Sequence, residues 1–270
     1  MNMYTFGFIG SGNMGGALAK AACMKLDPAT VVIANRHMEK SEALAKILGC
    51  KTAPDGAAVA KNSRYIFLGV KPQMMEGMLS KIAPVLKERQ DRFLLVTMAA
   101  GLTMERIAEM AGGDYPIIRI MPNTAAAVGE GVILYTHNEN VTKQEMDFFV
   151  NSMAAGGMLD EIDEHLIDAG CAVTGCGPAF CDMFIEAMAD AGVACGLTRG
   201  KALQYAAQMM IGTSKLMLMS GKHPEELKDS VCSPAGSTIQ GVRALEKGGF
   251  RSAVFEAVTA AYEKTVDLGK

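Results

Sequence analysis

The sequence predicts an α/β protein with an N-terminal Rossmann-like doubly wound sheet, followed by an all-helical C-terminal dimerisation domain. From residue 4 to about 162, short β-branched or aromatic runs alternate with helical patterns, as in right-handed βαβ units. After Glu161 the strand pattern stops, and apolar residues recur at helical spacing to the C-terminus. The 270 residues are enough for two small domains, which we expect at residues 1–162 and 163–270.

The expected elements of the first domain follow from these runs in chain order. Strands are predicted at 4–9, 31–34, 51–53, 65–70, 93–98, 116–121, 131–136 and 158–161. Helices are predicted at 13–25, 38–48, 73–87, 103–111 and 142–154. Doubly wound sheets bind their ligands beyond the carboxyl ends of the strands, so the loops that follow the strands are the candidate binding residues.

The first of these loops is a glycine-rich turn. Gly10-Ser11-Gly12-Asn13-Met14-Gly15 follows the strand 4–9 directly and opens a helix of small residues. Strand, Gly-x-Gly-x-x-Gly and helix in this order form a dinucleotide-binding fingerprint. The first glycine makes the turn, the second admits the pyrophosphate, and the third lets the helix pack on the strand. We therefore expect Gly10, Ser11, Gly12, Asn13 and Met14 to bind the cofactor.

The second strand ends at Asn35-Arg36, about where the adenosine ribose of the cofactor should lie. An NAD site usually places Asp or Glu there, whereas the first carboxylate here is Glu39. A guanidinium suits a 2′-phosphate, so the residues favour NADPH, with NADH as the alternative cofactor. The alternative is that Arg36 is a solvent-exposed charge on a loop and contacts no cofactor.

Three further loops fall at the same edge of the predicted sheet. They are Gly69-Val70-Lys71-Pro72, Met98-Ala99-Ala100-Gly101 and Met121-Pro122-Asn123-Thr124. Each joins a strand end to small residues that expose the backbone, and each alone could be ordinary turn chemistry. Three in succession favour a cofactor lining, for which we select Gly69, Val70, Lys71, Pro72, Met98, Ala99 and Ala100.

The segment Ser233-Pro234-Ala235-Gly236-Ser237-Thr238 is predicted to lead into a helix, with Ser233 as the cap and Pro234 in the first turn. Its small residues leave backbone N–H groups open, and the positive end of the helix dipole attracts an anion. A carboxylate bound there would leave the rest of its molecule within reach of the Thr238 hydroxyl. An ordinary capped helix is the alternative.

The C-terminal helices are apolar on more than one side. Ala202–Met219 carries Leu216, Met217 and Met219 off its main apolar stripe, and such a helix must be covered on several sides. Gln204, Gln208 and Lys215 interrupt it, which indicates a core helix and not a membrane span. We expect the helical domain to dimerise.

Composition excludes several classes of function. The net charge is −3 and no basic run is present, so no nucleic-acid partner is expected. The seven cysteines are scattered without a Cys-x-x-Cys pair, and no signal peptide precedes the first strand, both typical of a cytoplasmic protein.

Some residues have the type and spacing of a functional site but lack the further residues that such a site needs. Asp182, Glu186 and Asp190 are spaced like metal ligands, but no histidine accompanies them, so a solvated acidic flank is expected and no metal site. Cys171 and Cys176 are not at one-turn spacing, which disfavours a redox role. Lys71 could be a proton donor, but its place before Pro72 at a strand end favours cofactor contact.

Taken together, these motifs resemble the pyrroline-5-carboxylate reductase family over the whole chain. The motifs that carry the resemblance are Gly10–Gly15, Val70–Pro72, Met121–Thr124, Leu166–Ala169, Thr174–Phe180 and, most specifically, Ser233–Glu246. The resemblance implies an NAD(P)H-dependent oxidoreductase that reduces the C=N bond of 1-pyrroline-5-carboxylate to L-proline, the last step of proline biosynthesis. It also implies a homodimer of interleaved helical domains, often assembled further into a decamer.

The resemblance also suggests residue roles. The substrate carboxylate is assigned to the backbone amides around Gly236, Ser237 and Thr238, and the Thr238 hydroxyl to the ring nitrogen as the catalytic contact. Glu164 and Ser230 flank the expected substrate pocket. A protonated imine is already electrophilic, so no strong general acid is needed, and the four histidines lie outside these motifs.

The chain departs from the family pattern at four positions. Ala235 replaces the first of two glycines, Cys176 a common serine, Phe180 a common tyrosine, and Ala125 a common proline. Ala235 restricts the backbone if its site needs a positive φ. Two other functions stay open: another NADP-linked reductase such as a β-hydroxyacid dehydrogenase, and a non-catalytic nucleotide sensor or assembly protein.

Overall fold

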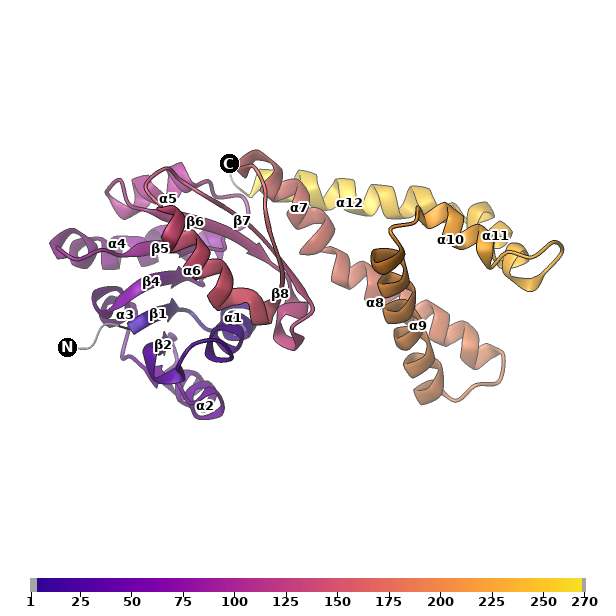
Figure 1. The fold of residues 1–270 in the computed structure, drawn as a ribbon, viewed down its shortest axis with the longest axis horizontal. Helices are drawn as coiled ribbons and strands as arrows, with labels where there is room; N and C mark the ends of the chain where they lie inside the picture. Colours follow the sequence, from indigo (N-terminus) through magenta and orange to yellow (C-terminus); the bar gives the residue numbers. More distant parts are fainter. Residues whose placement is uncertain (1–3, 269–270) are drawn as a thin grey trace. The chain divides into compact units, whose positions relative to one another are not determined.

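The computed structural model describes residues 4–268, which form two compact units (Figure 1). One unit consists of the chain up to Cys176 together with the chain from Ala261 onward, and it contains the β-sheet. The other unit is Gly177–Ala260, which is helical. The predicted boundary at residue 162 marks the end of the last strand, whereas the two units divide at residue 176.

The sheet has eight strands in the order β3-β2-β1-β4-β5-β6-β7-β8. In chain order the strands are β1 (Tyr4–Ile9), β2 (Val31–Ala34), β3 (Lys51–Thr52), β4 (Ser63–Leu68), β5 (Leu94–Thr97), β6 (Ile117–Pro122), β7 (Gly131–His137) and β8 (Gly157–Glu161). The strand order reverses between β1 and β4, so the predicted doubly wound sheet is confirmed. Only β6 and β7 pair antiparallel, because a short connection cannot make the crossover that parallel strands need.

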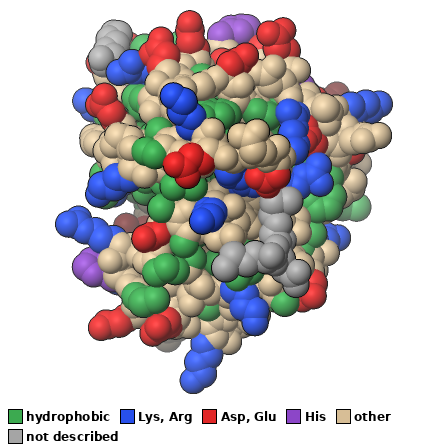
Figure 2. Space-filling view, turned by 90° about the vertical axis from the view of Figure 1, so that its left-hand side faces the viewer, with side chains coloured by type: hydrophobic (Ala, Val, Ile, Leu, Met, Phe, Trp, Pro, Cys, Tyr) green, Lys and Arg blue, Asp and Glu red, His purple; other side chains and the backbone are tan. Residues whose placement is uncertain are grey.

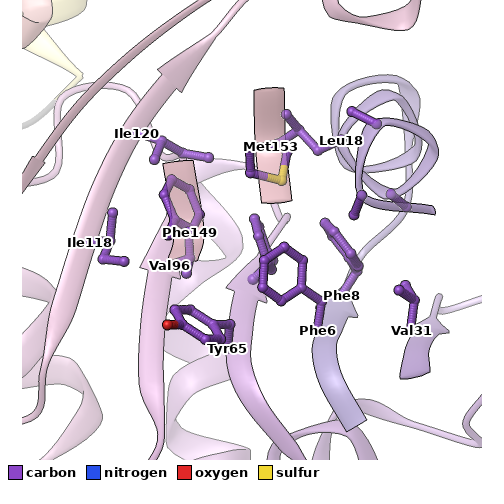
Figure 3. Packing of buried hydrophobic residues seen from close by; sticks show 14 of the residues in the cluster. Phe6, Phe8, Leu18, Val31, Tyr65, Val96, Ile118, Ile120, Phe149 and Met153 are labelled. Atoms are coloured by element: carbon purple, nitrogen blue, oxygen red, sulfur yellow. The ribbon is translucent and has the colours of Figure 1, made fainter. Parts of the chain in front are cut away.

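Helices cover both faces of the sheet, which is why its strands are apolar on both sides (Figure 1). On one face the core includes Phe6 and Phe8 of β1 against Leu18 and Phe149 (Figure 3). The helices of this face are α1 (Asn13–Cys23), α2 (Met38–Leu48) and α6 (Lys143–Met153). The opposite face is covered by α3 (Gly56–Asn62), α4 (Pro72–Glu88) and α5 (Met104–Ala111).

The sequence did not predict α3. It is a seven-residue helix whose first turn is held by the Asp55 carboxylate, which accepts the Ala58 N–H at 2.8 Å. Its buried residues are Val59 and Ala60. The predicted strand 65–70 also differs in its bounds, since β4 ends at Leu68 and leaves Gly69 and Val70 in the following loop.

After β8 the chain continues through η4 (Glu164–Leu166) and α7 (Ile167–Thr174) into five further helices. These are α8 (Gly177–Ala194), α9 (Arg199–Ser220), α10 (Pro224–Ser230), α11 (Ser237–Lys247) and α12 (Phe250–Asp267). In α9 only Ala202 and Ala206 are buried, while Leu218 and Met219 are exposed by 77% and 86%. The single chain therefore leaves much of this helix's apolar surface uncovered. Among residues 4–268 no helix has the length and apolar character to cross a membrane.

Candidate functional site

The glycine-rich loop between β1 and α1 is shaped by close backbone contacts. Gly10 has a φ of +93°, which favours glycine, and a Cβ there would crowd the carbonyl of Gly69. A Cβ on Gly15 would collide with the carbonyl of Gly10. A Cβ on Gly12, by contrast, would meet no atom within 4 Å. Gly10 and Gly15 therefore serve the packing of the loop, and Gly12 faces open space that a ligand can enter.

The start of α1 suits an anionic group. Gly12 is its N-cap, and no side chain caps the helix. The first amides of a helix lack intrahelical partners, and the helix dipole makes this end positive. This arrangement fits a pyrophosphate, which needs both open space and unpaired N–H donors.

Asn35 holds the glycine loop from the end of β2. The Ser11 N–H donates to Asn35 Oδ1 at 2.6 Å, and Asn35 Nδ2 donates to Ser11 Oγ at 2.7 Å. Both groups of the Asn35 side chain are thereby engaged by the loop. In this structure Asn35 shapes the binding loop, a role that its position at a strand end did not reveal.

A cleft of about 670 Å³ lies beyond the carboxyl ends of the first strands. The loops after β1, β2, β3 and β4 line it on one side and α4 on the other, and its lining residues include Gly10, Asn35, Arg36, Asp55, Val70, Met78 and Lys81. Arg36 and Lys81 are both exposed cations. Lys81 was missed by the sequence analysis because it belongs to no motif, and only the packing of α4 brings it to the cleft.

The remaining predicted cofactor residues lie in the loops that follow β4 and β5 and at the start of α4. Lys71 is the exposed N-cap of α4, and Pro72 is its first helical residue. After β5, Met98 and Ala100 are half-buried, whereas Ala99 is buried. The Ala99 N–H donates to Thr97 Oγ1 at 3.4 Å. Ala99 can thus offer a ligand its backbone but little of its side chain.

The segment before α11 differs from the prediction in its cap. The helix begins at Ser237 with Gly236 as N-cap, so the predictions of Ser233 as cap and Pro234 in the first turn are wrong. The Ser233 carbonyl instead accepts the Gly236 N–H at 3.0 Å in a turn that precedes the helix. Within this turn Ala235 has a φ of +60°, the one positive value of a non-glycine residue between residues 4 and 268. This left-handed residue prevents the helix from starting at Pro234.

The late start leaves α11 with an N-terminus that no side chain caps. Ser237 and Thr238 in its first turn are both exposed. The first-turn amides and the helix dipole can bind a carboxylate there, with the Thr238 hydroxyl beside it. Ser230 ends α10 with its hydroxyl donating to the Leu227 carbonyl at 2.7 Å.

Glu164 belongs to the sheet-bearing unit, whereas Ser230 and Gly236–Thr238 belong to the helical unit. The Oε1 atom of Glu164 accepts the Met104 N–H at 2.7 Å and lies 3.2 Å from Arg119 Nη1. Arg119 was not selected from the sequence, although a visible signal existed: a charged residue inside the apolar strand β6.

Asp190 and Cys171, members of the two clusters that resemble other sites, have identifiable surroundings. Asp190 forms an ion pair with Arg199 at 2.5 Å. Residues 4–268 contain no group of three or more His, Cys, Asp or Glu that could hold a metal. Burial raises the pKa of the Cys171 thiol to about 11, so it is protonated at neutral pH and a weak nucleophile.

Comparison with known proteins matches the two halves of the chain to two described families, and the whole chain to pyrroline-5-carboxylate reductases. Residues 164–268 match the family described as "Pyrroline-5-carboxylate reductase dimerisation", and residues 5–101 match "NADP oxidoreductase coenzyme F420-dependent". Pyrroline-5-carboxylate reductase of Escherichia coli (strain K12) is 41% identical over 266 residues, 98% of both chains. That of Glycine max is 36% identical over 267 residues, 98% of this chain and 96% of the relative.

Solved structures agree with these relatives. The crystal structure of Plasmodium falciparum pyrroline carboxylate reductase with NADP bound has a TM-score of 0.90 and 30% identity, and all of both chains is covered. The 1-pyrroline-5-carboxylate reductase of Streptococcus pyogenes has a TM-score of 0.88 and 29% identity, covering 99% of this chain and 100% of the other.

Proposed function

The chain belongs to the pyrroline-5-carboxylate reductase family, and we propose that it transfers a hydride from NADPH to the C=N carbon of 1-pyrroline-5-carboxylate. The product is L-proline, in the last step of proline biosynthesis. The observation that carries this proposal is the uncapped start of α11, where Ser237 and Thr238 offer a carboxylate site beside a hydroxyl. Because the chain also has a dinucleotide-binding loop, it can present a bound carboxylic acid to a nicotinamide.

The cofactor would be held along the carboxyl edge of the sheet. The open space over Gly12 and the start of α1 suit the pyrophosphate, with Gly10–Met14 around it. Arg36 is the cation for an adenosine 2′-phosphate, and NADH is the alternative cofactor because the same loop admits it. The other residues assigned to the cofactor are Asn35, Gly69, Val70, Lys71, Pro72, Met98, Ala99 and Ala100. When bound, NADPH supplies the hydride.

The substrate residues act on an imine that carries its own activating proton. The carboxylate is assigned to the amides around Gly236, Ser237 and Thr238, which fixes the ring in one orientation. Because the Gly236 N–H is already donated to the Ser233 carbonyl, the open donors for this contact are the amides of Ser237 and Thr238. The Thr238 hydroxyl contacts the ring nitrogen and steadies it as it changes from a protonated imine to an amine. Ser230 and Glu164 are the other two residues assigned to the substrate, as the family resemblance implies. No residue has to deliver a proton during the transfer, because the nitrogen already carries it.

We expect the enzyme to work as a homodimer formed by its helical domains, with a decamer as the larger assembly. The exposed apolar side chains of α9, including Leu216, Leu218 and Met219, support a covering partner. On the face shown in Figure 2, Lys and Arg alternate with Asp and Glu, which favours neither a nucleic-acid nor a membrane partner. The cysteines of the chain are free thiols, which is typical of a cytoplasmic protein.

The first test is oxidation of NADPH, and in parallel NADH, by the purified protein with DL-pyrroline-5-carboxylate, followed at the nicotinamide absorbance band. We expect a kcat of about 1 s⁻¹ or more, in the usual range of enzymes, with NADPH preferred. Folded protein that binds NADPH but turns over with neither cofactor would contradict the proposal and leave the β-hydroxyacid dehydrogenase and sensor functions.

A second test addresses Thr238. Thr238→Ala removes a hydrogen bond to a charged group, so kcat/KM for the imine should fall about 10- to 100-fold. Thr238→Ser keeps the hydroxyl and should retain most of the activity. If Thr238→Ala keeps nearly the activity of the native protein, the assigned contact with the ring nitrogen is wrong.

A further inference from the structure

Arg119 is the largest fully buried side chain among residues 4–268 and lies on β6 with 1% of its surface exposed. Its Nη1 lies 3.2 Å from Glu164 Oε1, and its Nη2 lies 2.7 Å from Asp168 Oδ1. Its Nε has no hydrogen-bond partner among the described residues. A buried charge is costly even when paired, and a well-packed apolar side chain often serves stability as well. The position therefore suggests a role beyond stability.

The carboxylate of Glu164 joins this arginine to the start of another helix. Its Oε1 also accepts the N–H of Met104, the first residue of α5, at 2.7 Å. One oxygen thus ties β6 and η4 to α5. The segment that leads into α5, residues 98–103, is fixed at its far end by this contact.

The near end of the same segment is held by the sheet. Arg119 of β6 is the register partner of Thr97, the last residue of β5. Thr97 Oγ1 in turn accepts the Ala99 N–H. Segment 98–103 is therefore fixed at both ends by groups connected to Arg119.

The strand order places this segment relative to a bound dinucleotide. The cleft lined by Arg36 lies beyond β1, β2, β3 and β4, and the glycine loop lies where the strand order reverses between β1 and β4. A dinucleotide that crosses this reversal places its second half beyond the ends of the strands on the other side, of which β5 is one. Segment 98–103 follows β5 and so faces the nicotinamide half.

We propose that Glu164, held by Arg119, is a positioning residue that fixes segment 98–103 against the nicotinamide half of the bound cofactor. The proposal rests on the proposed function and refines it, because it gives Glu164 a role other than substrate contact. A small displacement of this segment would misplace the nicotinamide without disturbing the adenosine end.

Two ligands separate the two halves of the cofactor site. Calorimetry with 2′,5′-ADP reports the adenosine half alone, and calorimetry with NADPH reports both halves. For Glu164→Ala we expect an unchanged Kd for 2′,5′-ADP, a Kd for NADPH raised about fivefold or more, and altered nicotinamide fluorescence of bound NADPH. Glu164→Gln keeps an oxygen that can accept both hydrogen bonds and should restore most of the affinity for NADPH.

A second variant leaves Glu164 in place. Met104→Pro removes the N–H that Glu164 accepts, together with a partly buried methionine side chain that packs on the core, and proline is well tolerated at the first position of a helix. Thr103, with φ of −76° and ψ of 162°, already has the extended backbone that a following proline requires. Met104→Pro should reproduce the loss of NADPH affinity. Met104→Ala, which removes the side chain and keeps the N–H, separates these two effects and should leave the Kd for NADPH unchanged. Arg106→Ala, which breaks an exposed ion pair on the same helix, is the matched control and should change neither Kd.

Turnover supplies an independent readout. A misplaced nicotinamide makes hydride transfer slower, so the kinetic isotope effect with 4-deuterated NADPH should rise in Glu164→Ala and Met104→Pro. An unchanged ratio of the two Kd values together with an unchanged isotope effect overturns the proposal. So does a change confined to the KM for the imine, since that indicates direct substrate contact. If the native protein does not reduce the imine, the proposed function fails, while the binding measurements still decide the role of Glu164.

Discussion

Replacing Ala235 by glycine should stabilise the protein, because Ala235 has a φ of +60° in the turn before α11. An L-residue with a side chain pays about 1–2 kcal/mol in the left-handed region, and glycine avoids this cost. Glycine also makes the unfolded chain more flexible, which removes about 0.4–1 kcal/mol of stability. The difference leaves a net stabilisation of about 0.5–1 kcal/mol for Ala235→Gly.

Thermal unfolding followed by circular dichroism measures this difference. For a chain of roughly this size, 1 kcal/mol corresponds to about 2–4 °C, so Tm should rise by about 1–4 °C. Both proteins are compared at one protein concentration, because subunit association makes Tm concentration-dependent. Ala43→Gly, the same exchange at an exposed position inside α2, is the control and should lower stability by about 1 kcal/mol. A Tm for Ala235→Gly that falls as it does for Ala43→Gly would refute the left-handed conformation.

Four further substitutions test the sheet-bearing unit. Gly12→Ala should leave the Tm unchanged, because the new Cβ meets no atom, but it should weaken NADPH binding about tenfold or more in calorimetry. Gly15→Ala should weaken binding and also lower the Tm, because its Cβ collides with the carbonyl of Gly10. Arg36→Ala should reduce the NADPH-to-NADH ratio of kcat/KM about tenfold, and an unchanged ratio contradicts the 2′-phosphate contact. Hydrogen bonding from Arg92 lowers the pKa of Glu145 to about 2, so its carboxylate stabilises the fold above about pH 4.5, and this stability is lost as the pH falls towards 2. Glu145→Gln should therefore cost roughly 2 kcal/mol at pH 7 in urea titrations, and a difference that does not shrink below pH 4.5 would count against this account.

The fold was largely predictable because its long elements carry strong patterns. Phe6 and Phe8 alternate with residues that face the opposite core, and β1 and β2 lie at the residues predicted for them. The helix α3 escaped prediction because seven residues span too few turns to show a period. Its formation depends on the cap from Asp55 and on the burial of Val59 and Ala60, which are consequences of the tertiary structure.

Some features of the candidate site depend on residues that are neighbours in the sequence, and others depend on residues far apart. The glycine loop is local, so its strand and helix context sufficed to predict it. The start of α11 is local too, but two preferences competed there: Ser233-Pro234 favours an early start, and the left-handed Ala235 delays it to Ser237. The backbone conformation of Ala235 decided where the helix starts. The sequence marked Ala235 as a departure from the family pattern but did not determine its φ.

The network around Arg119 depends on residues far apart in the sequence, which no spacing rule could join. Glu164 and Asp168 follow Arg119 by 45 and 49 residues and meet it only because η4 and α7 pack against the strands β6 and β7. A single arginine inside an apolar central strand is nevertheless informative by itself. Burial of a guanidinium requires acidic partners from elsewhere in the chain, and each partner then fixes the element that carries it. Glu164 lies in η4 and also accepts the N–H at the start of α5, so the buried charge couples the strand to a loop at the edge where ligands of such sheets bind.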